Sequence, residues 1–203
     1  NRRTFEYDAG ARLTAETDEL GNKTRYEYDT NDNLTKIMNP ASCCNSSEFS
    51  YDSYGNVKSI KDALGTTREY SYDVKHRLIS ISDPAGTETF SYDIMGRLIK
   101  QVDVLGRETK MTYTATNRLA STTDPNANKT TFEYDALGNR TKTTDPSGKV
   151  SRFAYDELSR LISVADPEGH LTKFEYDPIG NQTAIIDPTG AQTSFVFDSL
   201  NRQ

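Results

Sequence analysis

The chain has 203 residues and a formal net charge of −6, with acidic and basic side chains interspersed along its length. This balance disfavours nucleic acids and anionic membranes as partners, since both call for a basic face, and no stretch approaches the roughly 18 apolar residues of a membrane span. Hydrophobic residues make up only 34% of the chain, whereas an ordinary domain is about 45–50% apolar in a count that includes Gly and omits Tyr. We therefore expect an unusual core.

One aromatic position recurs every 20 to 23 residues, and an aspartate follows it in nine of its ten copies. A period in the range of about 20 to 50 residues is typical of repeat proteins, whose units bury apolar surface only against their neighbours. We expect residues 1–203 to form one continuous array of about nine to ten repeats, and to be a fragment of a longer protein because neither end carries a polar cap. The recurring residues are Tyr7, Tyr28, Tyr51, Tyr72, Tyr92, Tyr113, Tyr134, Tyr155, Tyr176 and Phe197.

The first element of each repeat is predicted to be a β-strand that ends at this tyrosine. A second aromatic column lies two residues earlier, and the residue between the two is usually polar. Residues two apart point to the same side of a strand, so this pattern predicts a half-buried strand with an aromatic face. The second column consists of Phe5, Tyr26, Phe49, Tyr70, Phe90, Phe132, Phe153, Phe174 and Phe195, with Met111 in the remaining copy; Tyr54 alone lies outside both columns.

The next element is a turn, called here the first turn, which begins at the aspartate and has the pattern Asp-x-x-Gly. Where glycine is missing, most copies place a residue in its slot that tolerates a left-handed backbone, so we interpret His76 and the other substitutes as turn residues. The glycine forms are Asp52–Gly55, Asp93–Gly96, Asp135–Gly138 and Asp177–Gly180, and the substitutes are Asp32, His76, Asn117, Ser159 and Asn201.

A second strand, poorer in aromatics, is predicted to follow, for example in Leu78-Ile79-Ser80-Ile81 and Leu161-Ile162-Ser163-Val164. Its alternation is imperfect, which indicates a β-bulge beside the first turn. A second turn, Asp-Pro-x-Gly, then closes the repeat as a type I turn in which Asp bonds the backbone ahead and Gly accepts a positive φ. Its clearest copies are Asp83 to Gly86, Asp145 to Gly148, Asp166 to Gly169 and Asp187 to Gly190.

Together these elements predict an all-β fold of tandem antiparallel β-hairpins, each of about 21 residues. Roughly nineteen strands about 4.8 Å apart make a ribbon on the order of 90 Å long. Open twisted sheets of more than about ten strands curl, so the ribbon is expected to form a curled or superhelical sheet such as a shell or tube wall. Its aromatic face is expected to be covered or curved in on itself.

The pattern also resembles a known family. Tyr-Asp-x-x-Gly-Arg-Leu, intact at residues 92–98, followed by Asp-Pro-x-Gly, is similar to the YD or Rhs (rearrangement hotspot) repeat over essentially the whole chain. Members include bacterial Rhs polymorphic toxins, the B and C components of insecticidal toxin complexes, and teneurins. The resemblance implies a hollow β-shell that encloses a C-terminal toxin, in a secreted or cell-surface bacterial protein, with neighbouring repeats and the toxin cargo as partners.

The residues give little support for catalysis, cofactor binding or metal binding. His76 and His170 lie at turns, no nucleophile is paired with an oriented base, and the family's self-cleaving segment is not found. Residues 29–33 imitate the start of an EF-hand, but Leu34 and Pro40 stand where that loop needs Gly and Glu. Cys43 and Cys44 are interpreted as part of an irregular loop. We expect no catalytic, cofactor-binding or metal-binding residue.

Our main hypothesis is therefore a structural scaffold without enzyme activity. Two alternatives remain. One is cell-surface adhesion or carbohydrate binding, although Tyr54 is the one aromatic outside the columns and the sequence offers no obvious stacking platform. The other is a self-assembling extracellular filament that joins copies of the chain through open β-edges.

Overall fold

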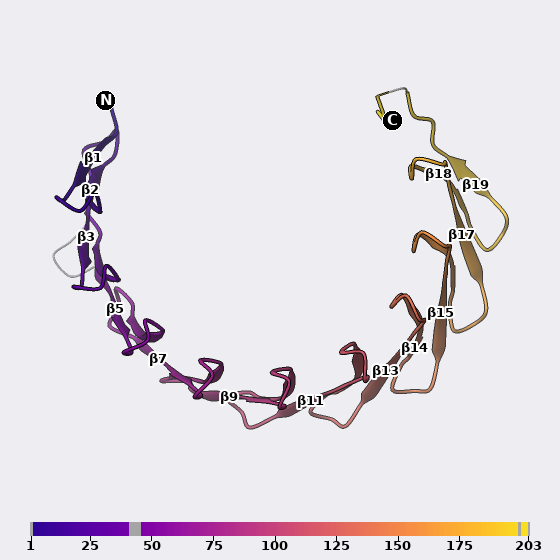
Figure 1. Ribbon diagram of the computed structural model, residues 1–203, viewed down its shortest axis with the longest axis horizontal. Helices are drawn as coiled ribbons and strands as arrows, with labels where there is room; N and C mark the ends of the chain where they lie inside the picture. Colours follow the sequence, from indigo (N-terminus) through magenta and orange to yellow (C-terminus); the bar gives the residue numbers. More distant parts are fainter. Residues whose placement is uncertain (1, 41–45, 199, 203) are drawn as a thin grey trace. The chain divides into compact units, whose positions relative to one another are not determined.

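The computed structural model describes residues 2–40, 46–198 and 200–202, and within these ranges the chain contains β-strands and no helix. It divides into two compact units, residues 1–108 and 109–203. The predicted all-β fold of tandem antiparallel hairpins is confirmed, and within each unit the ladder of strands is curved (Figure 1). That the whole chain is one continuous array stays a prediction.

In the first unit each strand from β1 to β9 pairs antiparallel with the strand that follows it in sequence. This is the order expected when every connection is a short hairpin turn. The strands are β1 (Thr4–Tyr7), β2 (Leu13–Thr17), β3 (Lys23–Tyr28), β4 (Leu34–Met38), β5 (Ser46–Tyr51), β6 (Val57–Lys61), β7 (Thr67–Tyr72), β8 (Leu78–Asp83), β9 (Gly86–Tyr92) and β10 (Leu98–Val102).

The second unit repeats the same order of consecutive antiparallel pairs. The odd-numbered strands other than β19 end at the column tyrosine, and the even-numbered strands are the second strands of the repeat. The strands are β11 (Glu108–Tyr113), β12 (Leu119–Thr123), β13 (Lys129–Tyr134), β14 (Arg140–Thr144), β15 (Val150–Tyr155), β16 (Leu161–Ala165), β17 (Leu171–Tyr176), β18 (Gln182–Ile186) and β19 (Gln192–Ser194).

The predicted bulge is present beside the first turn of each hairpin. In the β3–β4 hairpin Glu27 pairs with Lys36 and Tyr28 pairs with Leu34, so the residue between Leu34 and Lys36 has no partner. Directly paired residues share a face. The bulge therefore places Leu34 on the aromatic face beside Tyr28, three residues before Ile37, which pairs with Tyr26. This extra residue explains why the second strands do not alternate simply.

The turns have the predicted geometry. In the first turn after β5, the Gly55 N–H donates to the Asp52 carbonyl at 3.1 Å, and the N–H groups of Tyr54 and Asn56 both donate to Asp52 Oδ1 at 2.9 Å. The predicted substitutes for glycine all have positive φ: Asp32 (66°), His76 (60°), Asn117 (63°), Ser159 (61°) and Asn201 (57°). Ala11 (63°) occupies the same slot, and Ala127 (64°) occupies the glycine slot of a second turn; the sequence pattern did not single them out.

One predicted turn differs from the others. Asp83 and Gly86 form the last residue pair of the β8–β9 ladder, so the hairpin closes through a two-residue loop, and Gly86 has φ 141°. Tyr92 follows Tyr72 by 20 positions, one fewer than in most repeats. In most other repeats one residue separates the second turn from the strand that follows it. Here that residue is missing, and the two strands therefore pair up to the loop.

The core of this protein is thin. Among the described residues no large side chain is fully buried, and the most buried residues are the small Ala15, Ser121 and Ala184, each opposite the polar residue between two aromatic positions. The column aromatics inside the array are half-buried, whereas Tyr7 in β1 is 61% exposed. Apolar burial thus comes from side-by-side packing on one sheet surface and not from a second layer.

Replacing Ala127 by glycine is expected to stabilise the protein by about 0.5–1 kcal/mol. A left-handed backbone costs a non-glycine residue about 1–2 kcal/mol, which exceeds the roughly 0.5–1 kcal/mol of extra unfolded-chain entropy of glycine. Urea unfolding followed by circular dichroism measures the difference. Ala136→Gly is the matched control, because Ala136 is also an exposed turn residue but has no positive φ, and it should be neutral or destabilising. A lower urea midpoint for Ala127→Gly would contradict the prediction.

Candidate functional site: the junction between neighbouring hairpins

The repeated contact between one hairpin and the next is the most elaborate site of the described chain, and we call it the junction. Its first component is the column tyrosine. The hydroxyl of Tyr28 donates to the carbonyl of Leu13, the first residue of the preceding second strand, at 2.9 Å. The same bond joins Tyr51 to Leu34 (2.8 Å), Tyr72 to Val57 (3.0 Å), Tyr92 to Leu78 (2.8 Å), Tyr134 to Leu119 (2.9 Å) and Tyr176 to Leu161 (2.9 Å).

The ladder itself explains why a side chain bonds this carbonyl. Strand β2 pairs with β3 only over Ala15–Thr17, so Leu13 lies beyond the end of that ladder. A backbone carbonyl removed from water needs a hydrogen-bond donor. The tyrosine hydroxyl supplies the donor while its ring packs on the aromatic face.

The second component is an arginine that directly follows the first turn. Arg160 Nε donates to Asp156 Oδ2 in its own turn at 2.6 Å, and Nη1 donates to the Asp177 carbonyl in the next first turn at 2.9 Å. Its guanidinium lies 5.0 Å from the centre of the Tyr176 ring, within the range of a cation–π contact. One side chain therefore contacts the turn of its own hairpin and both the turn and the tyrosine of the next.

The arginine arrangement recurs elsewhere in the described chain. The guanidinium to ring-centre distances are 5.1 Å for Arg12 and Tyr28, 4.8 Å for Arg77 and Tyr92, and 5.9 Å for Arg118 and Tyr134. Gly138 shows how closely the arginine approaches, because a Cβ placed there would overlap the Arg118 guanidinium.

Several repeats have asparagine in place of this arginine. Asn181 Nδ2 donates to Asp177 Oδ2 at 2.9 Å and reaches Asn201 Oδ1 of the next first turn at 3.2 Å. Asn201 is one of the left-handed residues that replace glycine. Three more of these substitutes bond the preceding hairpin in the same way: Asp32 with Arg12 (2.6 Å), His76 with Asn56 (3.1 Å) and Ser159 with Asn139 (3.1 Å). A side chain in the glycine slot thus offsets its backbone cost by joining two hairpins.

The carboxylates of the first turns are held in the charged form. Hydrogen bonds from the Arg77 side chain and backbone lower the pKa of Asp73 to about 2. In three turns with asparagine, those of Asp29, Asp52 and Asp135, the side-chain amide is the largest cause that lowers the carboxyl pKa. Hydrogen bonds to an ionised carboxylate favour that form, and here each carboxylate serves its turn and the junction together.

The predicted residues of the second turn lie at the other end of the hairpins. Asp145, Asp166 and Asp187 accept the N–H bonds of their own turns, and Gly148, Gly169 and Gly190 each donate to the aspartate carbonyl with positive φ. Neighbouring second turns are joined in one place by an ion pair between Lys149 and Glu168 (2.7 Å). The structural importance of these residues and of the column tyrosines stays a prediction.

Sequence reasoning missed the arginine and asparagine of the junction, although a signal was present. One of these two residue types follows each of the ten first turns, from Arg12 to Arg202, yet the recurrence was used only to identify the family. The pattern gives the position of the side chain in its own turn. It does not give the partner in the next hairpin.

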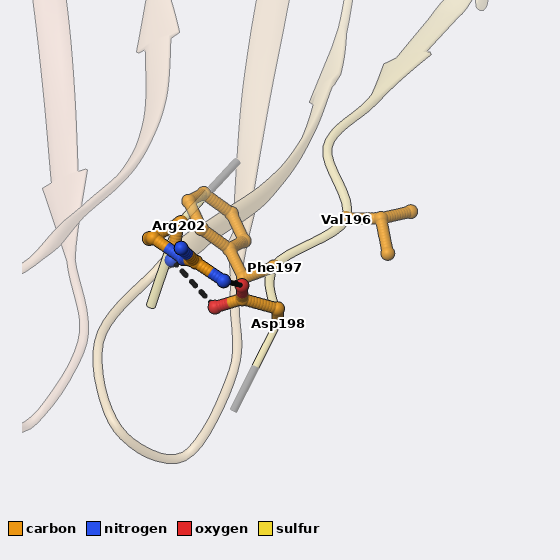
Figure 2. Close-up of a pocket in the computed structure, with 4 residues that line it drawn as sticks. All are labelled: Val196, Phe197, Asp198 and Arg202. Carbon is orange, nitrogen blue, oxygen red and sulfur yellow. Dashed lines mark hydrogen bonds and ion pairs between the residues drawn. The ribbon is translucent and has the colours of Figure 1, made fainter. Parts of the chain in front are cut away.

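Arg202 shows the same side chain in the last first turn of the chain. It bonds Asp198 Oδ2 at 2.7–2.8 Å and, with Val196 and Phe197, lines an open groove of about 530 Å³ (Figure 2). The Arg202 side chain is 73% exposed, compared with 26% for Arg160. Arg202 thus keeps the bond to the aspartate of its own turn that Arg160 also makes.

A search of the described positions found no group of three or more His, Cys, Asp or Glu side chains that could hold a metal ion. In the same positions no helix has the length and hydropathy needed to cross a bilayer. Cys43 and Cys44, interpreted above as an irregular loop, lie outside the described residues.

Comparison with known proteins identifies the family. The RHS Repeat model matches residues 7–41, 51–88, 72–108, 96–129, 113–150, 134–173 and 155–192. These ranges cover most of the chain, so the protein belongs to the RHS repeat family, as the sequence pattern predicted. A search of curated proteins gave no match. The family and the fold are those of a structural repeat scaffold.

Solved structures show the same fold. The crystal structure of TcdB2-TccC3-TEV matches with a TM-score of 0.76 at 16% identity, covering 98% of this chain and 12% of that one. TcdB2-TccC3 without its hypervariable C-terminal region matches at 0.65 and 18% identity, covering 91% and 12%. A Photorhabdus luminescens Tc holotoxin pore matches at 0.58 and 16% identity, covering 95% and 14%. The chain thus spans only about an eighth of the length of the structures it resembles.

Replacing Tyr176 by phenylalanine is expected to destabilise the protein by about 1 kcal/mol, because the Leu161 carbonyl loses its donor. Tyr155→Phe is the matched control, since the Tyr155 hydroxyl has no hydrogen-bond partner within the described part of the chain. Urea unfolding measures both variants. Equal effects of the two substitutions would show that the hydroxyl bond contributes nothing.

Acid is expected to weaken the junctions between about pH 4 and pH 2. The folded pKa of Asp73 is about 2 and its ordinary value is 3.8, so its carboxylate stabilises the fold above about pH 4, and this contribution disappears as the pH falls toward 2. Urea midpoints measured against pH should show the loss, and Asp73→Asn should reduce its steepness. An Asp73→Asn variant with an unchanged pH profile would exclude this carboxylate as a contributor.

Proposed function

We propose that the chain is a section of the wall of a hollow β-shell which encloses a C-terminal toxin or effector in a secreted bacterial protein. In this proposal residues 1–203 belong to one continuous repeat array of a longer protein, and they have no catalytic role. The partners are the neighbouring repeats and the enclosed polypeptide. The likeness to Tc toxin components, one of which is described as TcdB2-TccC3 without its hypervariable C-terminal region, supports the proposal.

The junction is the observation that carries the proposal. Neighbouring hairpins are joined by the strand ladder, and in most described repeats also by a tyrosine hydroxyl bond and by an arginine or asparagine at the turn. A wall has to exclude proteases and partners without opening between repeats. Contacts along the strands, at the strand ends and at the turn resist both separation and sliding of neighbouring hairpins.

Limited proteolysis of the full-length natural protein tests enclosure. The segment C-terminal to the repeats should resist cleavage in the native protein and become cleavable when the repeats are unfolded with urea. The same segment produced alone is the control and should be cleaved at once. Electron microscopy of the native protein should show hollow particles.

Rapid cleavage of the C-terminal segment in the native protein would contradict enclosure. Fibres in place of hollow particles would instead support the filament hypothesis, in which copies of the chain join through open strand edges.

A further inference from the structure

Strand β14 differs from the other second strands on the aromatic face. Each second strand pairs one residue with the repeat tyrosine and another with the second aromatic column. In β16 these residues are Leu161 and Val164, whereas in β14 they are Arg140 and Thr143. Among the second strands of the described chain, β14 is the one in which both are polar. We propose that Arg140 binds a carboxylate of an acidic polypeptide segment that lies on the aromatic face.

Two phenylalanine rings hold the Arg140 guanidinium. It lies 5.0 Å from the centre of the Phe153 ring and 5.8 Å from that of Phe132, both within the range of a cation–π contact. These rings belong to β15 and β13, the strands on either side of β14. A guanidinium that contacts rings keeps its N–H groups for a planar acceptor, and two parallel N–H groups match the two oxygens of a carboxylate.

The charge of Arg140 has no counter-charge on its own face. In the second unit it is the one charged residue among those that pair on the aromatic face of the described strands. Its guanidinium has no ion pair or hydrogen bond in the described ranges, whereas Arg160 is bonded to Asp156. The first unit also carries an arginine on this face, Arg68, but Asp83 pairs with it at 3.0 Å. A carboxylate beside Arg140 would therefore have to come from a partner.

Stability of the fold does not account for the polar residues of β14. In most described repeats the tyrosine hydroxyl bonds the first carbonyl of the preceding second strand, but the Tyr155 hydroxyl has no partner within the described chain. Thr143 Oγ1 is buried and also lacks a hydrogen-bond partner among the described residues. A buried hydroxyl without a partner is destabilising, and Val164, of nearly the same shape, fills the equivalent position of β16 without that cost.

The surroundings of Arg140 favour a polypeptide over a free carboxylate ion. Arg140 is exposed on the sheet surface, where a single ion pair contributes little to binding. The side chains of Phe132, Phe153 and Tyr155 on the adjacent strands are only half-buried. Apolar residues on both sides of an acidic residue would cover these rings and bury further apolar surface. An acidic residue between apolar neighbours thus supplies both kinds of contact.

Nuclear magnetic resonance titration of the full chain with acetyl-Val-Glu-Val-amide tests the proposal. The Arg140 Nε–H and Phe153 ring resonances should shift in a saturable way. The neutral acetyl-Val-Gln-Val-amide should bind at least about threefold more weakly, the order of magnitude expected for an exposed ion pair. Arg140→Gln should remove this preference without unfolding the chain, since β18 has Gln182 at the equivalent position. Arg152→Gln is the matched control and should keep the preference, because Arg152 is an exposed arginine on the opposite face of β15, also without a bonded partner in the described ranges.

Equal binding of the two peptides to the parent chain would overturn the proposal. The absence of saturable shifts at 50 mM, a concentration on the order of ten times a 5 mM Kd, would overturn it as well. A preference that survives Arg140→Gln, or that disappears in Arg152→Gln, would show that another group recognises the carboxylate. Propionate represents the free carboxylate, and binding as tight as that of the glutamate peptide would exclude a polypeptide as the ligand. These outcomes are independent of enclosure, which proteolysis of the full-length protein tests.

Discussion

The structure depends on the carboxylate that begins nine of the ten first turns. One oxygen accepts two backbone N–H groups and shapes the turn, while the other holds the arginine or asparagine that reaches the next hairpin, as in Asp156 with Arg160. Local folding and contact between repeats therefore use the same side chain. This dual use explains why the aspartate recurs with the tyrosine, although the two residues act on different parts of the hairpin.

A single-layer sheet has to obtain its stability from lateral contacts. The most buried described residues are small, and the aromatic side chains are only half-buried, so no central core holds distant repeats together. Each hairpin is stabilised by its two neighbours, as in other repeat proteins whose stability is a sum of unit and nearest-neighbour terms. Substitutions at one junction should accordingly act on that junction and leave remote repeats nearly unchanged.

The glycine slot of the first turn shows where prediction from sequence succeeds and where it stops. The tolerance of Asp and His for a left-handed backbone correctly predicted the positive φ of Asp32 and His76, because the turn that requires this conformation spans only four residues. Ala11 was missed, as was Ala127 in the corresponding slot of a second turn, because alanine carries no sign of such a conformation and the surrounding repeat imposes it. The bonds of Asp32 and His76 to the preceding hairpin could not be inferred, since those partners lie 20 residues away.

The amino-acid sequence by itself determined the period, the alternating strands, both turns, the bulge and the family, because each rests on interactions among residues close in the chain. Only the tertiary structure decided which groups meet across a junction. The tyrosine hydroxyl reaches a carbonyl 14 to 17 residues earlier, a distance set by strand register and by the extra residue of the bulge. The edge-to-face contact between Tyr54 and His76 arises in the same way, since the two rings come from turns of different hairpins that the ladder places side by side.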